Sequence, residues 1–128
     1  CRRPAAAAGR GLFFGVAGAL SNLSVDDEIE QLIASQPGLY FQGNNAVNSG
    51  NGNNFGDGLR CAGGGVIRLQ VRFASSGGTS NTNTSIATKG GCAAGDVKRY
   101  QAWYRDPAGS PCGAQFNLSN GYEVSWGA

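Results

Sequence analysis

The sequence predicts a mainly β protein: an antiparallel β-sandwich or jelly roll with one N-terminal helix and long Gly/Asn-rich loops. Glycine accounts for 22 of the 128 residues, whereas six Phe, four Tyr and two Trp provide the bulk for a thin core. Apolar and polar residues alternate in several short segments, and turn-rich stretches separate these segments, as in antiparallel sheets. We expect an N-terminal arm and short helix over residues 1–37 and a β-sandwich domain over residues 38–128.

The N-terminal arm includes a glycine-interrupted apolar segment over residues 11–20. Arginines precede it, as they precede the core of a signal peptide, and it is too short to span a bilayer. Because such a segment has to pack against something, we expect it on its own domain or on a neighbouring subunit. Added as a strand to a neighbour's open sheet edge, the arm would mediate self-association through main-chain hydrogen bonds.

A helix is predicted over residues 21–36. Ser24 is its expected N-cap, and the acidic residues that follow favour the positive end of the helix dipole. The sequence Pro37-Gly38 ends the helix. Its apolar face, at helical spacing, consists of Val25, Ile29, Leu32 and Ile33.

Residues 66–73 give the strongest strand signal in the chain, because apolar and polar residues alternate there without a break. We therefore expect this strand at the centre of the sheet, with its apolar face buried and its arginine face wet. The apolar face carries Ile67, Leu69, Val71 and Phe73, and the opposite face carries Arg68, Gln70 and Arg72.

Further strands are predicted before and after this one. Residues 43–58, rich in Asn and Gly, predict a long loop or a series of tight turns. The sequence Asn120-Gly121 is typical of a two-residue hairpin turn and is expected to join the last two strands. The expected strands cover residues 39–42, 85–88, 99–105, 116–118 and 122–126.

Composition excludes several kinds of chemistry. The chain has no histidine, which removes Ser-His-Asp and Cys-His catalysis and histidine-based metal sites. Its net charge is only +2 and its basic residues are scattered, so no nucleic-acid interface is expected. A hydrolase with paired carboxylates is the remaining catalytic hypothesis, but no pattern brings two of its candidates together, and we expect no enzyme. The candidates are Asp57, Asp96, Asp106 and Glu123.

Four cysteines, Cys1, Cys61, Cys92 and Cys112, form no Cys-x-x-Cys motif. An even number of cysteines and a thin core favour disulfides, and therefore an oxidising compartment. Three pairings are open, of which we favour Cys61 with Cys112 and Cys1 with Cys92. The alternative is free buried thiols in a cytosolic protein.

Two groups of residues are candidates for ligand binding. The loop over residues 50–58 offers Asn53, Asn54 and Asp57, whose oxygens suit Ca²⁺, although Asn and Gly in turns explain the same composition. Trp103 and Trp126 on alternating strands, with the Asn-rich loop, are candidates for a carbohydrate platform; the alternative is that they fill the core. No other cofactor or metal site is expected. Asn-x-Ser/Thr sequons begin at Asn22, Asn83 and Asn117.

Several phrases carry a resemblance to a known family. They are Gly38-Leu-Tyr-Phe-Gln-Gly43, Phe55-Gly-Asp-Gly-Leu-Arg-Cys-Ala-Gly-Gly64, Tyr104-Arg-Asp-Pro107, Ser110-Pro-Cys-Gly113 and Phe116-Asn-Leu-Ser-Asn-Gly121. With these phrases, residues 38–126 resemble a C-terminal β-rich domain of large secreted proteins of environmental bacteria. The resemblance implies export and a β-rich fold, and it implies no activity.

Together these observations predict a non-catalytic extracellular structural domain, a subunit or module of a cell-surface fibre or coat. The expected partners are further copies of the chain, bound through the N-terminal arm. The alternative is a lectin-like module that binds a glycan through Trp103 or Trp126. No membrane span is expected.

Overall fold

The computed structural model describes residues 13–19, 35–56, 58–78, 80, 82–83, 85–107, 113–119 and 121–127, with the backbone alone for 13–19. It confirms a mainly β fold with antiparallel sheets, and the described residues include one short helix, which is not the predicted N-terminal one. The described residues form one large sheet and two small ribbons, so a β-sandwich or jelly roll stays a prediction. Most of the predicted helix over residues 21–36 lies outside the described residues.

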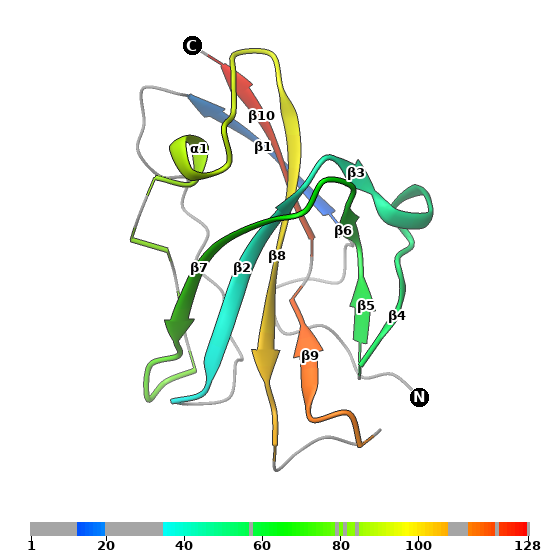
Figure 1. Ribbon diagram of the computed structural model, residues 1–128, viewed down its shortest axis with the longest axis vertical. Coiled ribbons are helices and arrows are strands. Elements are labelled where there is room, and N and C mark those ends of the chain that lie inside the picture. Colours follow the sequence, from blue (N-terminus) through cyan, green and yellow to red (C-terminus); the bar gives the residue numbers. More distant parts are fainter. Residues whose placement is uncertain are drawn as a thin grey trace.

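The main sheet has six strands in the order β1-β10-β8-β2-β7, with β9 also paired to β8 (Figure 1). The pairs are antiparallel, except that β1 runs parallel to β10. The sheet thus begins at one edge with the first strand of the chain and ends at the other with β7. The bounds are β1 Phe13–Ala19, β2 Pro37–Gly43, β7 Ile67–Phe73, β8 Val97–Arg105, β9 Phe116–Leu118 and β10 Gly121–Gly127.

The Asn/Gly-rich segment folds into tight turns and two small ribbons. The sequence predicted either a long loop or a series of tight turns here, and the structure has the turns. Strand β3 (Asn45–Ala46) pairs with β6 (Ala62–Gly63), and β4 (Asn53–Phe55) pairs with β5 (Gly58–Arg60). A 3-10 turn, η1 (Val47–Gly50), lies between β3 and β4. Figure 1 shows these ribbons and helix α1 (Ile86–Lys89) on opposite sides of the central strands.

Helix α1 replaces the strand predicted over residues 85–88, and that prediction is wrong. The Ser85 hydroxyl accepts a hydrogen bond from the Thr88 backbone N–H at 3.2 Å and caps the helix N-terminus. This local bond stabilises the first turn more directly than a distant strand partner does. The helix buries Ile86 and Ala87 against one face of the sheet.

The face of the sheet under α1 holds the larger core cluster and a buried polar network. Tyr100 donates to the Gln42 Oε1 at 2.9 Å and accepts from the Trp126 indole N–H at 3.0 Å. The Gln42 amide donates to the Gly90 carbonyl at 3.0 Å, which ties the loop after α1 to the sheet. The cluster comprises Tyr40, Leu69, Ile86, Ala87, Tyr100, Ala102, Val124 and Trp126.

Strand β7 lies at the sheet edge, so the prediction that it is central is wrong. A bulge interrupts its pairing: Tyr40 lies opposite Gln70 but Phe41 lies opposite Arg68, which leaves Leu69 as the extra residue. A bulge shifts the alternation of faces along the strand. Leu69 is 6% exposed, whereas the rest of the predicted buried face is exposed by 36%, 57% and 67%: Ile67, Val71 and Phe73.

The predicted hairpin at Asn120-Gly121 is also wrong. Strands β9 and β10 do not pair with each other; both pair with β8, β9 near its C-terminal end and β10 near its N-terminal end. Between them, Ser119 exchanges two hydrogen bonds of 2.9 Å with the Ala102 backbone, one from its N–H and one to its hydroxyl. The chain therefore continues along the same side of β8 instead of reversing.

Candidate functional site

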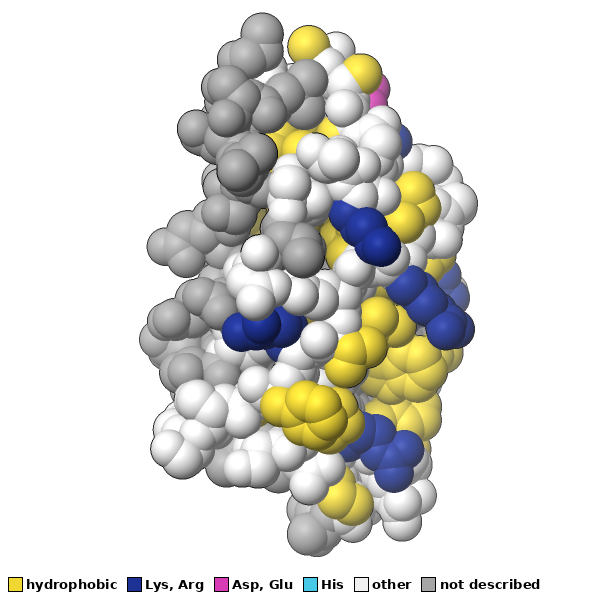
Figure 2. All heavy atoms as spheres, turned by 60° about the vertical axis from the view of Figure 1, so that its left-hand side comes forward, with side chains coloured by type: hydrophobic (Ala, Val, Ile, Leu, Met, Phe, Trp, Pro, Cys, Tyr) yellow, Lys and Arg dark blue, Asp and Glu magenta, His cyan; other side chains and the backbone are white. Residues whose placement is uncertain are grey.

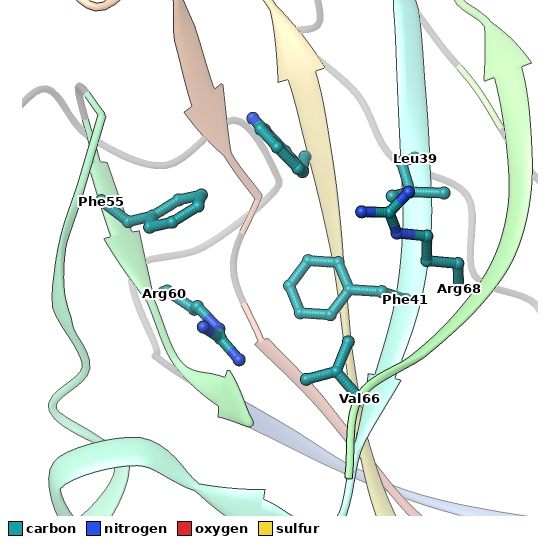
Figure 3. A pocket seen from close by; sticks show the side chains of 7 residues that line it. Leu39, Phe41, Phe55, Arg60, Val66 and Arg68 are labelled. Carbon is teal, nitrogen blue, oxygen red and sulfur yellow. The ribbon is translucent and has the colours of Figure 1, made fainter. Parts of the chain in front are cut away.

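The face of the sheet away from α1 carries a hollow lined mainly by apolar side chains. Alternation along β2 and β8 places Leu39, Phe41 and Trp103 on this face, because the residues directly under α1 are their neighbours in sequence. The hollow has a volume of about 140 Å³. We call it the aromatic hollow; it is lined by Leu39, Phe41, Phe55, Arg60, Val66, Arg68 and Trp103 (Figure 3).

The rings of Phe55 and Trp103 form one wall of the aromatic hollow, and the Phe116 ring contacts both of them. Phe55, Trp103 and Phe116 contact one another edge to face, with ring centroids 5.3–5.4 Å apart. Such contacts fix the ring positions as well as burying area. Gly56, with a φ of +61°, follows Phe55, and a side chain there would collide with the Phe116 ring. Glycine at this turn is therefore required for the β4–β5 ribbon to approach β9.

A buried amide holds the ribbons against the sheet. Gln101, 3% exposed, lies on β8, and its Oε1 accepts hydrogen bonds from the backbone N–H groups of Cys61 and Ala62 at 2.7 and 3.0 Å. Its Nε2 donates to the carbonyls of Leu59 and Ser119 at 3.1 and 2.7 Å. Three of these four hydrogen bonds thus fix the segment that carries Phe55 and Arg60 over the main sheet, and the fourth binds the chain between β9 and β10.

Two arginines line the aromatic hollow from opposite sides (Figure 3). The Arg60 guanidinium lies 6.0 Å from the Phe55 ring centroid, and its Nε donates to the Ala62 carbonyl at 3.2 Å. Arg68 is exposed and lies opposite Phe41 because the β7 bulge turns it to this face. Neither arginine forms a salt bridge with a carboxylate in the described part of the chain.

The apolar surface extends from the aromatic hollow to the edge of the sheet. Val71, 57% exposed, is in register with Leu39, which is in register with Trp103. Phe73, next on the same face of β7, is 67% exposed. In Figure 2 hydrophobic side chains gather beside several Lys and Arg side chains on one side of the molecule. This combination of exposed apolar and basic groups makes the surface a candidate for binding.

The structure separates the predicted ligand-binding residues. Trp103 is half-buried in the aromatic hollow, whereas Trp126 is 2% exposed in the core, the alternative that the sequence left open. Asn53 and Asn54 are exposed residues of β4, and Asp57 lies outside the described residues. Among the described residues no three His, Cys, Asp or Glu side chains gather at a metal site, and Ca²⁺ binding stays a prediction.

The three predicted carboxylates that the structure describes are far apart or bound locally. Asp96 and Asp106 flank β8 at its two ends, about 30 Å apart at the rise of an extended strand. Asp96 accepts a hydrogen bond from the Ala93 N–H at 2.8 Å, and Asp106 is buried. Glu123 forms a salt bridge with Arg99 at 3.0 Å.

Among the described residues, Cys61 and Cys92 form no disulfide with each other. Burial raises the pKa of the Cys61 thiol. The Cys92 thiol lies 3.3 Å from the Gln42 Oε1 and 3.4 Å from the Tyr100 hydroxyl. The pairings with Cys112 and Cys1 stay predictions, because both of these partners lie outside the described residues.

A second candidate site is the sheet edge formed by β10. Strand β1 pairs in parallel with β10 over seven residues, from Phe13 opposite Gly121 to Ala19 opposite Gly127. In this register Phe13 is opposite Gly121 and Gly18 is opposite Trp126, whereas Phe14 is opposite Tyr122. The apolar part of the N-terminal arm thus occupies the edge of its own sheet.

Comparison of the chain with protein-family models, with curated proteins and with solved structures finds no match. The described part of the chain contains no helix that is long and apolar enough to cross a membrane.

Proposed function

We propose that the protein is a non-catalytic extracellular assembly domain whose strand β1 completes the sheet of a neighbouring copy. The observation that carries the proposal is the pairing of β1 along the whole of β10, at an edge that no other described strand covers. A terminal strand that occupies its own sheet edge fits the same edge of an identical chain in the same register. Exchange of such an element is a low-cost route from a monomer to a dimer or a fibre.

The geometry of β1 supports an exchange of this kind. Parallel strands of one sheet require a long connection. Residues 20–36 provide such a connection between β1 and β2, the next strand along the chain. The strand pairs with β10 and with no other described strand, so its transfer to a neighbour leaves the antiparallel core of the sheet intact. Continued head-to-tail exchange would produce a filament, and a closed exchange a dimer. The predicted sandwich or jelly roll would require further strands on one face of the sheet.

Cysteine cross-linking at one register pair tests the proposal. Ala17 is opposite Ser125, which is exposed, and paired residues of neighbouring strands lie within disulfide distance. Chains with Ala17→Cys and chains with Ser125→Cys are unfolded together, refolded and oxidised. We expect a covalent dimer of the two variants on a non-reducing gel. Chains with Ala17→Ser and Ser125→Cys, mixed and treated alike, are the matched control for the native cysteines.

The opposite outcome is also well defined. If the double variant closes a disulfide only within one chain, and the mixed single variants stay uncoupled, β1 belongs to its own sheet and the proposal is wrong. Size-exclusion chromatography of a chain without residues 1–20 gives an independent test. Assembly through β1 predicts that this truncated chain is smaller in oligomeric state than the full chain.

A second candidate function, binding of a glycan, is favoured by the aromatic hollow. Trp103 is half-buried there beside Phe55, so part of its ring is open to a ligand. Ligand sites commonly combine an apolar or aromatic lining with a few polar groups, and Arg60 and Arg68 provide such groups here. A glycan array with the folded chain tests this function, and an array without any signal would exclude it.

A further inference from the structure

We propose that the aromatic hollow binds an acidic oligosaccharide, with a sugar ring against Trp103 and its carboxylate held by Arg60 and Arg68. The inference rests on the second candidate function and specifies the class of glycan. It starts from the charge of the lining, where two of the seven residues are arginine and none is acidic. A neutral sugar alone gives no reason for two cations in a mainly apolar hollow.

The aromatic wall is suited to the ring of a sugar. Trp103 is held by edge contacts with Phe55 and Phe116 at 5.4 and 5.3 Å, so its position is fixed before a ligand arrives. A rigid aromatic ring contributes large contact area at a small cost in conformational entropy. Phe41, 5% exposed, forms the floor and has little surface of its own left for contact.

The two arginines are suited to a carboxylate. A guanidinium has several N–H donors in a planar fork that matches the two oxygens of a carboxylate. The Arg68 side chain has no hydrogen bond or salt bridge with the described residues, so its guanidinium donors are available. Arg60 uses its Nε for the Ala62 carbonyl, which orients the guanidinium. Figure 3 shows the two side chains on opposite sides of the hollow, where they would flank a bound ligand.

The same charge disfavours a second copy of the chain on this surface. In a two-fold symmetric contact the same patch appears on both partners, so Arg60 and Arg68 would face the arginines of the other copy. Like charges brought together across an interface oppose association. An anionic ligand with apolar ring faces satisfies both the rings and the arginines.

The test is calorimetric titration of the full chain with a short oligogalacturonate and with its fully methyl-esterified form, which has the same rings without charge. We expect the acid to bind about tenfold more tightly, the effect of one charge-assisted hydrogen bond. Arg68→Gln should remove this preference. Arg72→Gln is the matched control, since Arg72 is on the same strand but opposite Gly38, on the other face. It should change little.

Trp103→Phe keeps a ring in the aromatic cluster and should weaken binding of both ligands, with circular dichroism as the check on folding. Equal affinity for the acid and the ester would overturn the inference and leave the glycan function intact. Binding of neither ligand would overturn both. Equal losses in Arg68→Gln and Arg72→Gln would assign the preference to overall charge and overturn the inference. Displacement of the sugar by an acidic peptide at equal affinity would overturn it as well.

Discussion

Replacement of Gln101 by leucine is expected to destabilise the protein strongly, although both side chains have similar size. Gln101 is 3% exposed and forms four hydrogen bonds, all to backbone groups. At about 0.5–1.5 kcal/mol for each net hydrogen bond, the loss amounts to about 2–6 kcal/mol. Leucine also leaves the N–H groups of Cys61 and Ala62 without their partner in a buried place, which moves the expected loss toward the upper end.

Equilibrium unfolding in urea measures this loss. Gln70→Leu is the control, because Gln70 is a half-buried amide on β7 whose partner Asn83 is exposed. Water replaces these bonds, so we expect a loss of about 1 kcal/mol or less. Equal losses in the two variants would contradict this prediction, since the buried amide would then contribute no more than an accessible one. The Gln101→Leu variant should also have a more exposed Trp103, visible as a red shift of fluorescence in the folded state.

Two further predictions concern the core under α1. Leu69→Ala should lower the free energy of unfolding by about 2–5 kcal/mol because Leu69 is buried, whereas Val71→Ala should lower it by no more than about 0.5 kcal/mol because Val71 is 57% exposed. Urea unfolding of both variants tests the bulge. Equal losses would contradict it. Burial, together with its hydrogen bond to Cys92, raises the pKa of Tyr100 above its ordinary value of 10.0. The unfolded chain then loses this proton first, so the stabilising contribution is complete below about pH 10 and is lost as the pH rises further. Urea midpoints across this range should fall less in Tyr100→Phe than in the parent chain, and parallel curves would contradict the assignment.

The sequence identified strands reliably where alternation is local. The segments that became β7 and β8 both have the period of two that a strand imposes on its residues. Strand order is different, because it depends on partners distant in sequence. Residues 67–73 have the pattern of a central strand, but their position at the edge and the bulge at Leu69 follow from pairing with β2.

Local turn signals failed where a tertiary contact competes with them. Asn120-Gly121 is typical of a hairpin turn, yet β8 is long enough to accept β9 and β10 one after the other on the same side. Ser119 fills the gap between them through its bonds with Ala102. In the same way, Ser85 has a hydroxyl that caps a helix, which outweighs the β propensity of Ile86.

The candidate site was predicted only in part, through Trp103. Phe55 and Arg60 lie in an Asn/Gly-rich stretch whose composition indicates turns, and no period marks them as residues of a binding surface. Their place above the sheet follows from Gln101, a polar residue in the middle of a strand of aromatic residues. A glutamine at such a position indicates that a second element packs there. A buried amide needs hydrogen-bond partners, and the backbone of a second element usually provides them.

The bulge in β7 links the two faces of the sheet. Without an extra residue between the partners of Tyr40 and Phe41, strict alternation would place Leu69 and Arg68 each on the opposite face of the sheet from the one observed. With the bulge, Leu69 enters the core under α1 while Arg68 reaches the aromatic hollow on the other face. The same bulge therefore stabilises the core through Leu69 and gives the candidate site its exposed cation, Arg68. An edge strand is where such a change costs least, because only one neighbouring strand has to adapt to it.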